Sequence, residues 1–332
     1  MFDWKTKEDI IAEAYETESS RRSLRGVLLA AKKYEEEYGK DLSEFDKAEM
    51  QRFFDDNAGR RHSSVVVFTS RIKHYLEGAK RRGANLMCDI SSDIDFKGDR
   101  IRKFRETVVF SPDHLSDYLD AVFGDTRNES VAVVYKCFYW LAFCDIDEDD
   151  ALALEDSSVN LASKNIIFKG RDIPLYEQSY DVFELAKTLK TFKVYKSGSA
   201  KPIVYQREDG SRLLRCTKRG GVSKAVHEGQ RRMTKELSRY IKAAVDNGVV
   251  TARIRYYNAR MSGVFYRAFL REQMSMDPGF NAIVERRLSD PDYHPSSNLV
   301  YNAKKSRLLS EYRDDYALWK SARDLFVKDS HL

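Results

Sequence analysis

Phe143-Cys-Asp-Ile-Asp-Glu-Asp-Asp-Ala-Leu-Ala-Leu154 joins a strongly apolar segment to a dense acidic one. Seven acidic residues and no basic residue lie between positions 145 and 156. Upstream, the apolar run of residues 131–143 is long enough to favour a buried helix over a strand. The pattern Asp150-Ala-Leu-Ala-Leu154 predicts a short helix, followed by a turn at Ser158-Val-Asn160. Because a helix macrodipole stabilises carboxylates at the helix start, we favour that role for the acidic run over a metal site.

A β-hairpin is predicted just after this turn. The sequence Asn165-Ile-Ile-Phe-Lys-Gly-Arg-Asp-Ile-Pro-Leu-Tyr176 has the pattern of two short strands around a tight turn at Lys169-Gly-Arg171.

The first 90 residues predict four helices. Apolar residues recur there at helical spacing and form stripes, of which the clearest comprises Leu24, Val27, Leu28, Ala31 and Tyr34. Residues 91–106 are polar and show neither the helical nor the strand spacing of apolar residues, so they predict a linker. We therefore expect a helical domain at 1–90, a linker at 91–106 and a second domain at 107–332.

The charge of the chain is unevenly distributed. The formal net charge is only +5 over 332 residues, but residues 196–240 carry twelve Lys or Arg against four acids. That segment is therefore at +8 and the rest of the chain at −3. Such a basic region is either a solvated face or a nucleic-acid contact.

Several classes of protein are not expected from this sequence. The four cysteines lack paired spacing, which argues against a disulfide framework or a zinc site. No apolar run of transmembrane length and no signal peptide is found, so we expect a cytoplasmic protein. No P-loop, HExxH or Rossmann glycine pattern occurs, and no cofactor or metal is expected.

The order of these segments resembles that of the tyrosine recombinases, or phage integrases. In that family the place of Cys144-Asp-Ile-Asp147 reads threonine-glycine-leucine-arginine, ahead of a short helix ending in alanine-leucine. The resemblance implies a mainly α fold with a small β-hairpin or sheet. It also implies two domains, an N-terminal SAM-like helical core-binding domain and a C-terminal integrase catalytic-like domain.

The resemblance also implies that the catalytic residues are degenerate. Asp147 stands where the family has its phosphate-binding arginine, and a carboxylate repels phosphate. Arg260 in the box Tyr257-Asn-Ala-Arg260 matches the family's second arginine, but Tyr257 takes the place of a histidine. Asp290 takes the place of a second histidine, and Tyr301 falls at the nucleophile position.

Some of these positions allow two interpretations. In the family a hairpin lysine protonates the leaving oxygen, and Lys169 falls on that place; it is otherwise a DNA contact or a plain surface lysine. Tyr301 is either a nucleophile by position or a tyrosine packed under the last helix, and we favour the second interpretation.

Since losing one donor to the developing charge costs about 10²–10³ in rate, little strand transfer is expected. Phosphate binding is a sum of many contacts and survives such losses. The side chains expected to contact DNA are Arg60, Arg61, His62, Ser63, Arg71, Lys73, Lys80, Lys169, Arg171, Arg215, Lys218, Arg219, Arg260, Lys304 and Lys305.

The function that the resemblance implies is regulatory. The chain looks most like the integrase-like lysogeny repressors of SPβ-type Bacillus phages. That resemblance implies a repressor of lytic genes that is not an enzyme. It also implies that the protein binds operators in double-stranded DNA, in the nucleoid of the bacterial host. Two other classes stay open: an active recombinase with atypical residues, and a protein whose basic region contacts another protein or RNA. The segment from Arg307 to Val327 carries an apolar stripe that either mediates self-association or folds back on its own domain.

Overall fold

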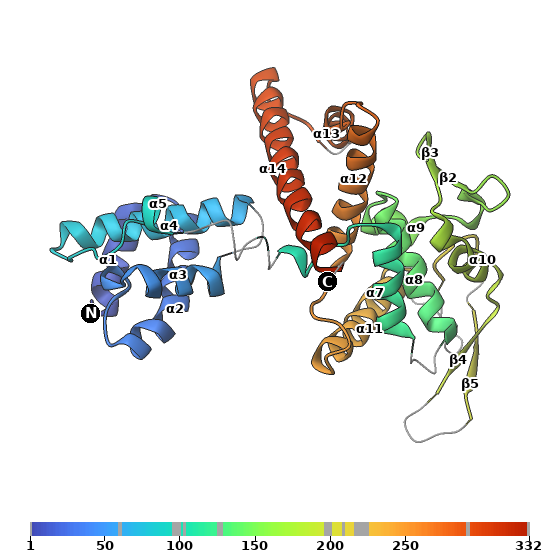
Figure 1. Ribbon diagram of the computed structural model, residues 1–332, viewed down its shortest axis with the longest axis horizontal. Helices are drawn as coiled ribbons and strands as arrows, with labels where there is room; N and C mark the ends of the chain where they lie inside the picture. Colours follow the sequence, from blue (N-terminus) through green and yellow to red (C-terminus); the bar gives the residue numbers. More distant parts are fainter. Residues whose placement is uncertain are drawn as a thin grey trace. The chain divides into compact units, whose positions relative to one another are not determined.

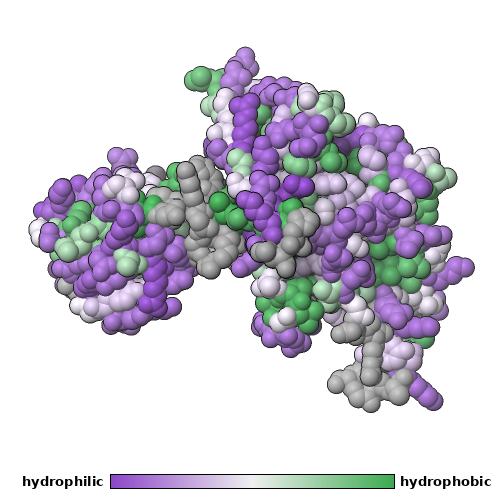
Figure 2. All heavy atoms as spheres, in the orientation of Figure 1, coloured by the Kyte–Doolittle hydropathy of each residue, from purple (hydrophilic) through white to green (hydrophobic). Residues whose placement is uncertain are grey.

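The structure is a computed structural model that describes residues 2–58, 62–94, 101, 104–124, 129–195, 201–207, 210–215, 226–289 and 293–330, without the side chains of 62–64, 226–233 and 330. The chain divides into two compact units. One comprises Met1–Phe104 and Phe280–Leu332, and the other comprises Arg105–Gly279. Hydrophilic residues predominate on the surface that Figure 2 displays, where the hydrophobic residues form small groups.

The N-terminal part of the first unit is helical (Figure 1). Its elements are α1 (Trp4–Ala14), α2 (Glu18–Tyr38), the 3-10 turn η1 (Leu42–Glu44), α3 (Lys47–Asn57), α4 (His62–Arg81) and the short α5 (Ile90–Asp93). Local chemistry sets several of these ends. Asp46 and Glu49 form a reciprocal capping box at the start of α3, and Gly39 ends α2 with a φ of 69°.

These helices enclose one apolar core. The stripe predicted on α2 is confirmed, since its five residues are all buried, and Ile10, Phe53 and Ile72 from α1, α3 and α4 are fully buried in the same core. The structure also shows that α5 extends over residues 91–93, at the start of the segment expected to be a linker. Ile90 and Ile94 are buried in this core, so the beginning of that segment is packed.

A buried polar network connects four elements of this part. Lys7 of α1 forms ion pairs with Glu35 of α2 and with Asp41, 3.2 Å away, at the start of η1. Tyr75 of α4 donates its hydroxyl to Asp41 at 2.8 Å. Lys7, Glu35 and Asp41 are each at most 3% exposed, so one cation serves two carboxylates in the protein interior, and burial raises the pKa of Glu35.

Two further helices belong to the first unit, α13 (Phe280–Leu288) and α14 (Asn298–Ser330). Tyr312, Tyr316 and Trp319 form the buried stripe of α14, and Phe280 of α13 stacks on Tyr312 with ring centroids 5.8 Å apart. The apolar stripe of the C-terminal segment therefore packs, at least in part, against α13 of the same chain. Self-association through this helix stays a prediction.

The second unit is built around α8. Its elements are α7 (Pro112–Phe123), α8 (Glu129–Phe143), α9 (Glu148–Ala153), η2 (Asp156–Ser158), β1 (Val159–Asn160), β2 (Asn165–Phe168), β3 (Arg171–Pro174), η3 (Glu177–Ser179), α10 (Tyr180–Thr188), β4 (Thr191–Val194), β5 (Ile203–Gln206), α11 (Val226–Asp246) and α12 (Tyr256–Gln273). From position 134 onward, α8 is buried at every residue except Lys136, as its composition predicted. It contacts α7, α9, α10, α12 and β4.

Two small antiparallel sheets complete this unit. The order of the first is β1-β2-β3, with Ile166 opposite Ile173, and the second pairs β4 with β5. The predicted hairpin at 165–176 is confirmed, whereas the hairpin of β4 and β5 was not predicted.

A mainly helical fold with small sheets is thus confirmed. The predicted division at residues 90 and 106 stays a prediction, and the contact units instead separate at residue 104 and group Phe280–Leu332 with the N-terminal helices.

Candidate functional site

The acidic run begins at the C-terminal cap of α8. The N–H of Asp145 donates to the carbonyl of Ala142 at 2.8 Å, and that of Ile146 donates to Leu141 at 3.1 Å, which together form a Schellman motif. Asp145 takes the left-handed position of this motif with a φ of 62°. Glycine usually fills that position, but aspartate tolerates it better than most residues. Asp145 is therefore a cap residue and not part of a solvated acidic surface.

One face of α12 holds the end of α8. Tyr256, Arg260, Gly263 and Arg267 lie at positions i, i+4, i+7 and i+11, which share a helix face. Tyr256 donates its hydroxyl to the carbonyl of Ile146 at 3.0 Å, and Arg267 donates to that of Phe143 at 2.8 Å.

Between these contacts, the helices approach too closely for a side chain. A Cβ on Gly263 would lie 1.9 Å from the carbonyl oxygen of Phe143, so glycine is required there.

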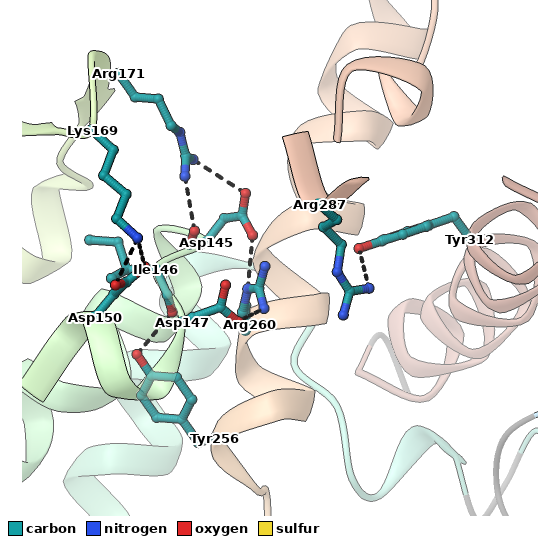
Figure 3. A network of polar contacts seen from close by, with 10 residues as sticks. All are labelled: Asp145, Ile146, Asp147, Asp150, Lys169, Arg171, Tyr256, Arg260, Arg287 and Tyr312. Carbon is teal, nitrogen blue, oxygen red and sulfur yellow. Dashed lines mark hydrogen bonds and ion pairs between the residues drawn. The ribbon is translucent and has the colours of Figure 1, made fainter. Parts of the chain in front are cut away.

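Arg260 is the centre of an ion-pair cluster (Figure 3). Its Nε donates to Oδ1 of Asp145 at 2.9 Å, and its Nη1 contacts Oδ1 of Asp147. Arg171 of β3 donates to Oδ2 of Asp145 at 3.2 Å and to its carbonyl at 3.1 Å. The side chains of Arg260 and Asp145 are 6% and 3% exposed, so this pair is buried.

Lys169 lies at the turn of the hairpin. Lys169 and Gly170 have φ angles of 47° and 72°, as a two-residue hairpin turn with two positive φ angles requires. The turn directs the Lys169 side chain to the carboxylate of Asp150, 2.8 Å away in α9 (Figure 3). The two interpretations of Lys169 as a DNA contact and as a proton donor stay predictions.

The structure therefore brings Asp147, Lys169, Arg171 and Arg260 together, but it pairs each cation with a carboxylate. Including Glu148 and Asp149, residues 145–150 supply five acids against these three cations. Such a cluster does not attract a further anion. A DNA contact by Arg260 stays a prediction, and in this arrangement it requires Asp147 to turn away.

Arg215 is anchored to the body of the second unit. It forms an ion pair with Asp156 at 2.5 Å and donates to the carbonyl of Gly210 at 2.7 Å. The neighbouring Arg207 is 6% exposed and donates to the carbonyls of Leu189 and Leu213. Both arginines therefore fix part of the basic segment of residues 196–240 to the body of the second unit. The predicted contacts Lys218 and Arg219 lie outside the described residues.

On α4, the predicted contacts differ in their surroundings. Lys73 and Lys80 are exposed, seven residues apart on one face. Arg71 stacks on Tyr15, 4.2 Å from the ring centroid, and its Nε donates to Ser23 at 3.3 Å. Arg60, Arg61 and the side chains of His62 and Ser63 lie outside the described residues.

The remaining predicted residues lie on α12 and near α14. Tyr301 and Lys304 are half-buried in the first turns of α14, where Lys304 lies over the ring of Tyr293, and Lys305 forms an ion pair with Glu285 at 2.7 Å. Tyr257 is half-buried in the first turn of α12. Asp290 lies outside the described residues.

A basic surface on α11 was not singled out from the sequence. Among the side chains that the structure describes, the exposed cations of α11 and of the loop that follows it are Lys235, Arg239, Lys242, Arg253 and Arg255. The first three are spaced i, i+4 and i+7, a signal that the count of charges over 196–240 concealed.

Within the described ranges, no three His, Cys, Asp or Glu side chains are grouped to hold a metal ion. In the same part of the chain, no helix is both long enough and apolar enough to cross a bilayer.

Residues 1–79 match the family model described as MrpR, N-terminal core-binding domain. A structure titled "Crystal structure of XerA recombinase" is similar to the chain at 12% identity and a TM-score of 0.33, over 95% of this chain and 98% of that one. No curated protein matches the sequence. The family match confirms the N-terminal core-binding domain that the resemblance predicted.

Proposed function

We propose that this protein binds specific sites in double-stranded DNA and represses transcription of phage lytic genes, using the body of a tyrosine recombinase without strand transfer. The observation that carries the proposal is the pairing of Lys169, Arg171 and Arg260 with carboxylates of the acidic run. DNA binding is supported by the core-binding domain at residues 1–79.

Charge supports the proposal that strand transfer is absent. Attack by a tyrosyl oxygen on a phosphodiester builds negative charge on the phosphate, which aimed donors must stabilise. The guanidinium of Arg260 instead stabilises two carboxylates, and Asp147 would face the developing charge with a charge of the same sign. Such an arrangement raises the barrier to the reaction.

DNA binding requires cations that face solvent. Lys73 and Lys80 on α4 meet this condition in the first unit, and Lys235 and Arg239 on α11 meet it in the second. Phosphate contacts of this kind supply affinity that is independent of sequence, so the base contacts that define an operator come from other side chains.

The first test is binding to duplexes selected from a random library, followed by repression of a reporter under the selected site. Affinity should fall with salt, with a slope of about −0.9 per phosphate contact. Lys73→Glu and Lys80→Glu, each as a single variant, should weaken binding and flatten the slope. Lys32→Glu on α2, which replaces an exposed lysine near Glu36, is the matched control. Salt-independent binding would contradict the proposal.

The second test separates this proposal from the active-recombinase alternative. A nicked suicide substrate that carries the selected site is incubated with the protein and resolved on a denaturing gel. No covalent adduct is expected, and Tyr301→Phe should leave repression unchanged. An adduct that forms with the wild type and disappears in Tyr301→Phe would overturn the non-catalytic assignment.

A further inference from the structure

Asp147 occupies a helix N-cap position without capping the helix. An aspartate at this position ordinarily accepts a hydrogen bond from a backbone N–H of the first turn. The side chain of Asp147 makes no such bond at the start of α9 and contacts Nη1 of Arg260 instead. Asp147 therefore gives up a local hydrogen bond for a contact with a residue on another helix.

This contact is not required to hold Arg260 in place. Asp145 is buried and binds Nε of Arg260 at 2.9 Å, so Arg260 already has a carboxylate partner in the interior. The side chain of Asp147 is 60% exposed, and an ion pair with such an exposed partner contributes little to stability. The contact matters because it places a carboxylate against the guanidinium of Arg260, on the solvent side of the Arg260–Asp145 pair.

A carboxylate and a phosphate bind a guanidinium in the same way, through charge-assisted hydrogen bonds from its N–H groups. A phosphate that approached Arg260 would have to displace Asp147. It would also meet the other acids of residues 145–150. With Asp147 uncharged, the cluster has one anion fewer and Nη1 loses its carboxylate.

We propose that Asp147 is an internal competitor of phosphate at Arg260, and that its carboxylate keeps DNA phosphates from the guanidinium of Arg260. The competition at Arg260 does not depend on DNA binding, but its effect on duplex affinity rests on the proposed function. Asp147 would then confine the phosphate contacts of the protein to cations outside the cluster.

The chain offers a matched control for the test. Asp149 lies two residues further along the same acidic run, is exposed and lies in the first turn of α9. Asp147→Asn and Asp149→Asn change the net charge equally, but only the first removes the carboxylate from Arg260. Asp147→Ala is a second variant, which removes the carboxylate without leaving an amide.

The first measurement uses the full chain and inorganic phosphate at constant pH, with chloride at matched ionic strength as the reference. Phosphate should raise the melting temperature of Asp147→Asn and Asp147→Ala, because a ligand that binds only the folded state stabilises it. It should have no such effect on the wild type or on Asp149→Asn. Equal responses of Asp147→Asn and Asp149→Asn would overturn the proposal.

The second measurement is the affinity for a mixed-sequence duplex over a range of salt. For Asp147→Asn, we expect about 3- to 10-fold tighter binding and a slope steeper by about 0.9, as one added phosphate contact requires. Asp149→Asn should keep the wild-type slope, and a slope unchanged in Asp147→Asn would overturn the proposal. If the wild type binds no duplex at all, the proposed function fails, while the phosphate measurement still decides the role of Asp147.

Discussion

The carboxylate of Asp145 accepts a hydrogen bond from Nε of Arg260 at 2.9 Å, and both side chains are buried. One belongs to the C-terminal cap of α8 and the other to α12, 115 positions later. The arginine that the box pattern assigned to phosphate therefore also has a structural role, which is to neutralise a buried charge.

Replacing Arg260 should consequently destabilise the second unit. Removing one partner of a buried ion pair typically costs about 3–5 kcal/mol, and we expect the lower end for Arg260→Ala because Arg171 still donates to Asp145. Urea denaturation followed by circular dichroism measures this loss. Arg255→Ala, at the exposed N-cap of the same helix, should change stability by less than about 0.5 kcal/mol. Equal effects of the two variants would contradict a structural role of Arg260.

Two glycine variants should change stability in opposite directions. Gly263→Ala places a Cβ against the backbone of Phe143, where neither helix yields cheaply, and should cost about 1–3 kcal/mol or more. Gly26→Ala, within α2, meets no atom within 4 Å and should gain up to about 1 kcal/mol from helix propensity. Thermal unfolding of both variants tests this contrast. A neutral Gly263→Ala would mean that α8 and α12 are less closely packed than described.

The network around Lys7 should be the most sensitive polar site of the N-terminal domain. Lys7→Met leaves Glu35 and Asp41 buried without their cation, which should cost about 3–5 kcal/mol. Lys5→Met, on the exposed side of the same helix, should be within about 0.5 kcal/mol of the wild type. Chemical denaturation of both variants is the measurement. If Lys7→Met unfolded at the same denaturant concentration as the wild type, the two carboxylates would be solvated or protonated in the folded protein.

Stability should also decrease in mild acid because of His114. Burial lowers the pKa of His114 to about 4. The negative charge of Asp117 opposes this shift, and the positive charge of Arg105 adds to it. Its Nδ1 accepts the N–H of Phe110 at 3.3 Å, which requires the neutral ring.

The unfolded chain takes up this proton near pH 6.5, so the contribution of His114 is complete above that pH and is lost as the pH falls toward 4. The difference between urea midpoints at pH 7 and pH 5 should therefore be smaller in His114→Gln than in the wild type. His294→Gln, at an exposed position, should keep the wild-type difference.

Much of the fold could be predicted from local pattern. Helical periodicity identified the stripe on α2, and two short apolar runs around the tight turn Lys169-Gly-Arg171 indicated the hairpin. The strands β4 and β5 were missed because β5 lies inside the segment of residues 196–240, in which charge dominated the pattern, and β4 lies just before that segment.

The candidate site was predicted less completely, since its decisive contacts are long-range. Nothing near Asp145 in the sequence indicates that Arg260 neutralises it. Tyr256 and Arg260 of α12 contact the acidic run, and of these two the box pattern identified only Arg260. The predicted Tyr257 is one position from Tyr256, which on a helix is a rotation of about 100°, so Tyr257 lies on another face of α12.

An arginine placed at position 147 should not confer strand transfer. Asp147→Arg replaces the internal carboxylate by a second guanidinium, so duplex affinity should rise and become more dependent on salt. Strand transfer should still be absent, because the resemblance to recombinases assigns Tyr257 and Asp290 to the places of both histidines, and each missing donor costs about 10²–10³ in rate. The measurement is the denaturing gel with the nicked suicide substrate, with Asp149→Arg as the control for added positive charge. A covalent adduct in Asp147→Arg that is absent from Asp149→Arg would show that Asp147 alone prevents cleavage, and that the rest of the recombinase machinery is still present in this chain.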